Sequence, residues 1–201
     1  MTIVIILVKT PGKFRTDEMR VSKEQAAKNR ARIIEVASRL MRERGIAGIT
    51  VDALTEAAGM THGSLYSQLG SKERLVEEAV TYAITTKGQE LPEVLALEDY
   101  VSEYLSAAHR DEPGSGCPFA ALCSEIPRQS GGVKDRFTAG VRGMVAWLSG
   151  RMESGLKPRQ REEKALATVA SLVGALVLAR AVSDPKLSDD ILRATRKGLG
   201  T

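Results

Sequence analysis

Residues 45 to 78 read GIAGITVDALTEAAGMTHGSLYSQLGSKERLVEE, and this stretch decides the fold. It contains helix beginnings in close succession, two of them separated by a short turn. Thr50 is placed to cap one helix, and Gly59 stands where the end of that helix needs a left-handed residue. Thr61 is placed to cap a second helix over residues 62–69. This spacing predicts a helix-turn-helix, the unit whose second helix lies in the DNA major groove.

Further helical patterns flank this unit. Gly70 is placed to end the second helix, and Ser71 is placed to cap a third helix that is expected to run to Lys87. Its expected buried residues are Leu75, Ala79 and Tyr82. A longer helix upstream ends at Gly45, with Ile33, Ala37, Leu40 and Met41 on one face. We therefore expect three helices around a small core. On geometry alone, the same unit is also a common packing element of all-α domains.

The residues within the unit make the assignment more specific. The segment GMTHGSLYSQLGSKERL closely resembles the recognition helix and the following helix start of the tetracycline-repressor (TetR) family of bacterial transcriptional regulators. A Leu-Tyr pair and a later Ser-Lys pair recur in that family, and here they are Leu65, Tyr66, Ser71 and Lys72. The preceding RVSKEQAAKNRARIIEVASRLMRERGIAGITVDALTEAAG resembles the family's first two helices. The chain departs locally at Leu69, where the family usually has an aromatic residue, and at Ser67 and Gln68.

The start of the recognition helix is expected to read DNA. His62 offers a donor or an acceptor to base edges, and Gly63 lets the backbone approach closely. The resemblance implies phosphate contacts for Ser64, Tyr66 and Lys72. The complete set of expected DNA contacts is Thr50, Thr61, His62, Gly63, Ser64, Tyr66, Gln68 and Lys72. Three alternatives stay open: Tyr66 braces the core, the two threonines act only as caps, and Lys72 is merely solvated.

Composition and charge agree with a soluble regulator. The chain of 201 residues is 43% apolar and 27% charged, which is ordinary for a globular protein. Residues 1–44 carry 11 Lys or Arg against 5 Asp or Glu, whereas the remainder carries 18 against 20. This excess lies beside the predicted DNA-reading unit, as a phosphate-binding arm requires. A solvated basic helix face would give the same run of charge.

The cysteine usage and the N-terminus restrict the class of protein further. Two cysteines and two histidines make neither a disulfide framework nor a zinc cluster, so we expect no metal, no cofactor and a cytoplasmic location. The opening MTIVIILV is too short for a membrane span and lacks the flanks of a signal peptide. It is expected to form a short strand, or to precede a true start at Met19. Residues 1–19 are therefore treated as an N-terminal extension.

Beyond residue 88 the pattern is helical again. One apolar stripe runs from Leu97 to Ala108 and another from Val133 to Met152, both at helical spacing. The segment HRDEPGSG between them is expected to be a loop. Pro118 fits the first position of a short helix that reaches about Ile126.

The segment KPRQREEKALATVASLVGALVLARAV predicts a helix buried on more than one side, because no charge appears between Ala165 and Ala179. A membrane span is one alternative, but fifteen uncharged residues are short of the roughly 20 that a span requires. Asp184 and Pro185 then break the chain before a last helix. The resemblance to the TetR family implies that these two helices, about residues 161–199, build a homodimer interface. A helix buried inside its own subunit is the other alternative.

Together these patterns predict an all-α chain. A helix-turn-helix DNA-binding domain is expected over residues 20–70, and a helical effector-binding and dimerisation domain over 71–201. The resemblance implies a homodimeric regulator, most simply a repressor, that releases its operator when a small molecule binds. Residues expected to line the effector pocket are Tyr100, Tyr104, Cys117, Phe119, Met144 and Trp147. Plain core packing is the alternative for each of them.

Cys117 raises two further hypotheses. It precedes Pro118 at a helix beginning, where unpaired amides would favour its thiolate and make it a sensing residue. With His109 as base it would instead be the nucleophile of an enzyme, although no third orienting group is evident. A non-specific architectural DNA binder is a further class, which a separate second core argues against. We therefore expect a regulator and not an enzyme.

Overall fold

The structure is a computed structural model that describes residues 23–63, 70–90, 96–153 and 155–200. Over these residues the chain is helical and contains no strand, so the predicted all-α class is confirmed. The strand expected in MTIVIILV lies outside the described residues. The elements are α1 (Lys23–Arg44), α2 (Val51–Ala58), α4 (Lys72–Glu90), α5 (Leu97–Tyr104), α6 (Ala107–Asp111), α7 (Pro118–Leu122), the 3-10 turn η1 (Ile126–Arg128), α8 (Gly131–Ser149), α9 (Pro158–Ala181) and α10 (Pro185–Gly198).

Three of the predicted helix caps, at Thr50, Gly59 and Ser71, are present. The Thr50 hydroxyl accepts a hydrogen bond from the Ala53 amide at 3.1 Å and so begins α2. Gly59 ends α2 in the left-handed region with φ 67°. The Ser71 hydroxyl accepts a bond from the Arg74 amide at 3.2 Å at the start of α4. Each bond satisfies an amide that the first turn of a helix leaves unpaired.

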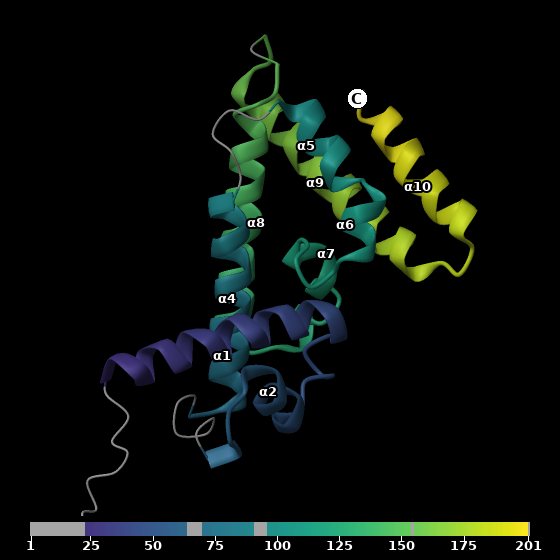
Figure 1. Cartoon of the computed structure of the whole chain (residues 1–201). Helices are drawn as coiled ribbons and strands as arrows, with labels where there is room; N and C mark the ends of the chain where they lie inside the picture. Colours follow the sequence, from purple (N-terminus) through teal and green to yellow (C-terminus); the bar gives the residue numbers. More distant parts are fainter. Residues whose placement is uncertain (1–22, 64–69, 91–95, 154, 201) are drawn as a thin grey trace, which may run out of the picture.

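The helices form two groups joined by α4 (Figure 1). In the lower group α1 lies across the first half of α4, with α2 beneath it. In the upper group α4 and α8 run side by side, and α9 packs against α8. Helix α10 lies at the outer edge and packs on α9. The chain therefore passes from one group to the other along a single helix.

Two hydrophobic cores correspond to these groups. The first contains the buried faces of α1, α2 and the first half of α4, including Leu75 and Ala79, and it also takes in Leu122 and Val133. The second joins α5, α7, α8, α9 and α10. Ile84 in α4 packs against both cores. The first core thus crosses the predicted boundary after residue 70, and that boundary stays a prediction. Helix α4 is also longer than expected and ends at Glu90.

Two sequence expectations about the upper helices are wrong. The stripe from Leu97 to Ala108 is not one helix, because the Ser106 hydroxyl accepts the His109 amide at 3.1 Å and begins α6. The segment expected as a loop is therefore helical in its first three residues. The helix from Pro118 ends at Leu122 instead of Ile126. Pro127 has no N–H to donate to a preceding carbonyl, so an α-helix cannot continue unbroken through it, and the chain forms η1 there instead.

Helix α9 has both a buried and an exposed apolar face. Seven of its residues are buried, among them Leu172 and Leu176. Leu166 and Leu178 are 50% and 56% exposed. At about 100° a residue, the exposed or partly exposed positions 166, 167, 170, 171, 174, 177, 178 and 181 share one face. By length and composition α9 could also cross a membrane, and it is the one described helix of which this is true.

Candidate functional site

The DNA-facing residues were predicted at the beginning of the second helix of the helix-turn-helix and around it. Thr50, Thr61, His62, Gly63 and Lys72 are all exposed. Three other predicted contacts, Ser64, Tyr66 and Gln68, lie outside the described residues. The described set therefore provides a surface that a partner can reach, and base or phosphate contacts stay predictions.

Asp52 is a neighbour of His62 that the sequence reasoning missed. The His62 Nε2 atom lies 2.8 Å from the Asp52 carboxylate, and both side chains are largely exposed, by 60% and 82%. The carboxylate stands in the first turn of α2, where the helix dipole favours an acidic residue. This position in the sequence was the signal from which the contact with His62 could have been predicted. Asp52 holds the imidazole at the junction of the two helices.

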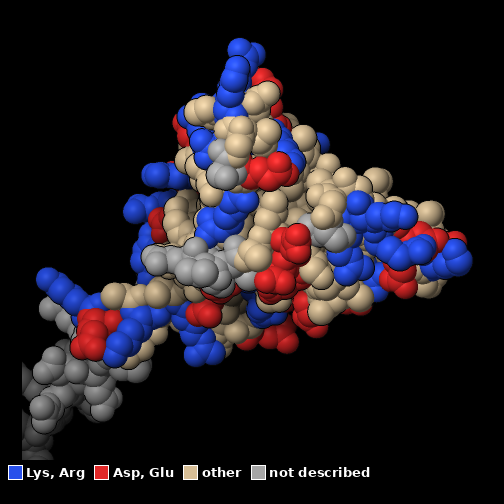
Figure 2. Space-filling view, turned by 90° about the horizontal axis from the view of Figure 1, so that it is seen from above, with Lys and Arg blue, Asp and Glu red and all other residues tan. Residues whose placement is uncertain are grey.

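Several basic residues in the described part of the N-terminal segment make intramolecular contacts. Lys28 pairs with Glu24 at 2.7 Å, and Arg39 pairs with Glu43 at 2.8 Å. Arg30 binds the Glu78 carboxylate with two nitrogens and so joins α1 to α4. This hydrogen bonding holds the pKa of Glu78 below its usual range. Basic and acidic side chains lie side by side where α1 begins (Figure 2, left), so this surface is less positive than the sequence suggested.

A cavity of about 840 Å³ opens between α4, α5, α6, α7 and α8. That volume lies in the range that drug-sized ligands occupy. All six residues predicted to line an effector pocket are on its wall: Tyr100, Tyr104, Cys117, Phe119, Met144 and Trp147. The structure thus brings the six together, and their contact with a ligand stays a prediction.

Aromatic rings form one wall of this cavity. Tyr100 packs against Trp147 with ring centroids 4.8 Å apart, and against Tyr104 at 5.8 Å. Phe119 meets Phe137 edge to face at 5.2 Å. Tilted and edge-to-face pairs of this kind are the favoured aromatic geometries. The wall is therefore rigid and apolar.

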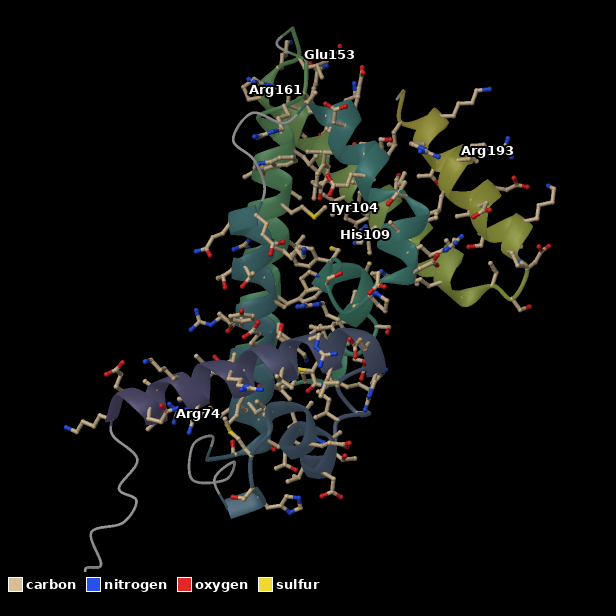
Figure 3. The ribbon with its side chains drawn as sticks, viewed as in Figure 1. Arg74, Tyr104, His109, Glu153, Arg161 and Arg193 are labelled. Atoms are coloured by element: carbon tan, nitrogen blue, oxygen red, sulfur yellow. The ribbon has the colours of Figure 1, made fainter. Side chains whose placement is uncertain are left out.

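His109 lies beside this wall, next to Tyr104 (Figure 3), and its hydrogen bonds indicate a neutral ring. The Cys117 amide, which can only donate, bonds to Nε2 at 3.0 Å. The ring proton must then lie on Nδ1, which is 2.7 Å from the Tyr104 carbonyl oxygen. Burial lowers the pKa of His109, in agreement with the neutral form. Arg180 of α9 donates to the carbonyls of His109 and Arg110 at 2.7 and 2.9 Å and anchors α6.

This arrangement argues against two hypotheses about Cys117. Its thiol is buried, and burial raises the thiol pKa. The expected stabilisation of a thiolate at the start of α7 is therefore wrong, because desolvation outweighs the amides there. His109 also has no free lone pair with which to act as a base towards the thiol. Cys117 packs as a small apolar residue in the second core.

Two glycines of α8 shape the cavity, and the sequence reasoning missed both. A Cβ atom on Gly140 would come within 2.6 Å of Ile84 on α4, so Gly140 allows the two helices to approach. A Cβ atom on Gly143 would meet no described atom within 4 Å, and Gly143 lines the cavity. Two glycines three residues apart in an amphipathic helix were the signal for a cavity at this position.

Side chains of the upper group also hold the end of α1. The Glu125 carboxylate accepts hydrogen bonds from the amides of Ile46 and Ala47 at 3.1 and 3.2 Å. Arg42 donates to the Gly114 carbonyl at 2.7 Å, in the loop that precedes Cys117. Burial lowers the pKa of Arg42. The loop next to the cavity is thus bonded directly to the DNA-reading group.

Comparison with known proteins agrees with this arrangement. The family model described as bacterial regulatory proteins, tetR family, matches residues 33–79. The HTH-type transcriptional regulator TtgR of Pseudomonas putida is 41% identical over 59 residues, which cover 29% of this chain and only 28% of TtgR. An HTH-type transcriptional regulator of Mycobacterium tuberculosis is 29% identical over 187 residues, covering 83% of this chain and 92% of that protein.

The fold is shared with solved structures. A TetR-family transcriptional regulator from Agrobacterium tumefaciens superposes with a TM-score of 0.70 at 22% identity, covering 86% of this chain and 98% of its own. Its likeness concerns the whole fold, whereas the family model concerns the helix-turn-helix. These relatives are transcriptional regulators and not enzymes. The chain thus resembles the tetR family of bacterial regulatory proteins in its helix-turn-helix, residues 33–79, and shares its fold with solved TetR-family regulators.

Proposed function

We propose that the protein is a cytoplasmic, sequence-specific DNA-binding regulator, and that it acts as a homodimeric repressor released by a small molecule. The exposed start of the recognition helix, around His62, would enter the major groove. Lys72 and Thr50 would contact phosphates beside it. The proposal is supported by the match of residues 33–79 to the tetR family model and by the exposure of these residues.

One observation supports the control of DNA binding by a ligand. The first half of α4 packs in the DNA-reading core through Leu75 and Ala79, while its second half, from Thr81 to Glu90, lines the cavity. A molecule that displaces the second half therefore moves the first. In a dimer this tilt changes the separation of two recognition helices, which must be roughly 34 to 36 Å to enter successive major grooves. The effector must bind the splayed state more tightly than the DNA-bound one.

The exposed face of α9 supports the homodimer. Leu166 and Leu178 are about half exposed in a single subunit, within a stretch that carries no charge. An apolar face of this kind is typical of an interface between subunits. A membrane would also cover it, but α9 contributes Leu172 and Leu176 to the core and packs between α8 and α10. A second copy of the chain is the partner that we propose.

The DNA-binding proposal is tested by two alanine variants. Selection of bound sequences from random duplexes should first enrich a site with two half-sites. On that site His62→Ala should weaken binding by about 1 to 3 kcal/mol and relax the preference at one base pair. Lys72→Ala should weaken binding similarly on all sequences and flatten the salt dependence by about one unit. Gel shifts at several salt concentrations, with selected and scrambled DNA, measure both effects.

The exposed Lys186 in the first turn of α10, outside the helix-turn-helix, is the control for Lys72, and Lys186→Ala should leave both readouts unchanged. Failure to enrich any sequence would contradict specific recognition. Unchanged binding in both His62→Ala and Lys72→Ala would show that the recognition helix does not contact the DNA.

A further inference from the structure

The residues that line the cavity indicate which kind of molecule could bind there. No charged side chain is among the buried residues of its inner surface. Tyr104, Cys117, Phe119 and Met144 are each no more than 8% exposed. The ring of His109 is neutral, because its two nitrogens are occupied by the Cys117 amide and the Tyr104 carbonyl. An ionised group placed against these residues would lose its hydration without gaining a charged partner among them. Arg180 lies beside Gly116, outside the lining, and two of its nitrogens already donate to the carbonyls of His109 and Arg110.

The charged residues of the cavity lie on helix ends and surface loops around it. Lys87 is paired with Glu90 at 2.5 Å at the end of α4. Arg136 on α8 lies 3.6 Å from Glu77. Glu103 and Glu112 are exposed. The cavity is therefore apolar and aromatic inside and charged only where it meets water.

Among the described residues that line the cavity, one buried polar side-chain atom is without a hydrogen-bond partner. The Tyr104 hydroxyl is buried and has no hydrogen-bond partner among the described residues. The Cys117 thiol, which is only a weak acceptor, lies close enough to interact with it. Buried polar groups nearly always have a partner, and the large volume next to Tyr104 leaves room for one. The hydroxyl is thus available as a donor to a bound molecule.

We propose that the effector is an uncharged, flat aromatic molecule that carries a carbonyl or ether oxygen. Its rings lie between Trp147, Tyr100 and Phe119, and its oxygen accepts a hydrogen bond from the Tyr104 hydroxyl. This inference rests on the proposed function, because it names the ligand class of the same cavity. It excludes carboxylates, phosphates and organic cations as the group that enters the interior.

Trp147 provides a direct measurement, since it is the single tryptophan of the chain and lines the cavity. Four pyrenes of similar size test the class: 1-acetylpyrene, 1-ethylpyrene, 1-pyrenecarboxylate and 1-pyrenemethylammonium. Each accepts energy from tryptophan, so binding quenches the emission of Trp147. We expect 1-acetylpyrene to bind at least tenfold more tightly than the carboxylate and the ammonium compound. Tighter binding of either charged probe would overturn the proposal.

The variant Tyr104→Phe isolates the hydrogen bond. It should weaken the binding of 1-acetylpyrene roughly five- to tenfold, as the loss of one hydrogen bond requires. The affinity for 1-ethylpyrene should stay the same or increase. An equal effect on both probes would overturn the role of the hydroxyl. Thermal unfolding of the variant without probe checks its fold.

A second variant tests the place of binding even if Tyr104→Phe folds poorly. Gly143→Leu puts a side chain into open space in the cavity and should abolish quenching by 1-acetylpyrene without loss of stability. Gly131→Leu adds the same side chain at the start of α8, where it also meets no described atom, and should change nothing. Quenching that survives Gly143→Leu would place the probe elsewhere and overturn the proposal.

The ligand class of the cavity and the release of the operator by a ligand are tested separately. Quenching needs no DNA, whereas release of the selected operator is followed by gel shift. If 1-acetylpyrene binds as described and releases no operator, the ligand class stands and ligand control by this class fails. If a charged probe binds more tightly and releases the operator, ligand control stands and the class is wrong.

Discussion

Glu125 joins the two groups of helices, and its removal should weaken the whole chain. Its carboxylate accepts hydrogen bonds from the backbone amides of Ile46 and Ala47, directly after α1. The turn is closely fitted to this carboxylate. Gly45 has φ 77°, and a Cβ atom there would lie 2.6 Å from the Glu125 Oε1 atom. No other side chain replaces these bonds among the residues that the structure describes.

The size of the effect follows from the burial of the two amides. Ala47 is exposed, so water can replace the carboxylate there. Ile46 is only 3% exposed, and its amide would lose its acceptor without a substitute. A hydrogen bond to a charged acceptor contributes about 1.5 to 3 kcal/mol. We therefore expect Glu125→Ala to lower the free energy of unfolding by about 2 kcal/mol, and Glu125→Gln, which keeps one acceptor oxygen, by about 1 kcal/mol.

For a chain of this length, a loss of about 2 kcal/mol lowers Tm by roughly 4 to 8 °C. Thermal unfolding followed by circular dichroism measures the shift at a fixed protein concentration. Glu35→Ala, in the middle of α1 on its exposed face, is the control and should stay within about 0.5 kcal/mol of the parent chain. If Glu125→Ala melts within one degree of that control, Glu125 does not hold the turn after α1.

Two further predictions concern His109 and the exposed face of α9. Burial lowers the pKa of His109 below its ordinary 6.5, so the stability that its neutral form gives is complete above that pH and falls as the pH drops. Thermal melts at pH 7.5 and 5.5 should therefore differ more in the parent than in His109→Gln, and an equal difference would contradict a buried neutral ring. Leu178→Glu should give a folded monomer with operator affinity reduced at least tenfold, whereas Leu176→Glu should unfold the chain, because Leu176 is fully buried within its own subunit. Light scattering and circular dichroism separate the two results, and a parent chain that is monomeric at micromolar concentration would contradict the proposed interface.

The sequence by itself determined where α2 begins and ends and where α4 begins. Thr50, Gly59 and Ser71 act through hydrogen bonds and backbone angles that involve residues no more than four positions away. Such interactions form in any context that permits a helix, so their signals can be read without a fold.

The six cavity residues were only partly determined by sequence. Aromatic and methionine side chains at helical spacing indicate a core, and the six do lie in or against one. That they surround open space depends on how far apart α4 and α8 lie, which Gly140 and Gly143 influence from the facing surface. Volume is a property of several helices together, and no single periodic pattern contains it.

Only the tertiary structure decided the chemistry of the interior. The proton on Nδ1 of His109 follows from a donor eight residues away, and the anchor of α6 comes from Arg180, far along the chain. The turn after α1 is held by Glu125, 79 residues later than Ile46. The stripe from Leu97 to Ala108 was misjudged because α5 ends at Tyr104 and Ser106 caps the start of a separate helix, α6. Hydrogen bonds between distant segments exist only after the cores have packed, and their desolvation then determines which groups stay neutral.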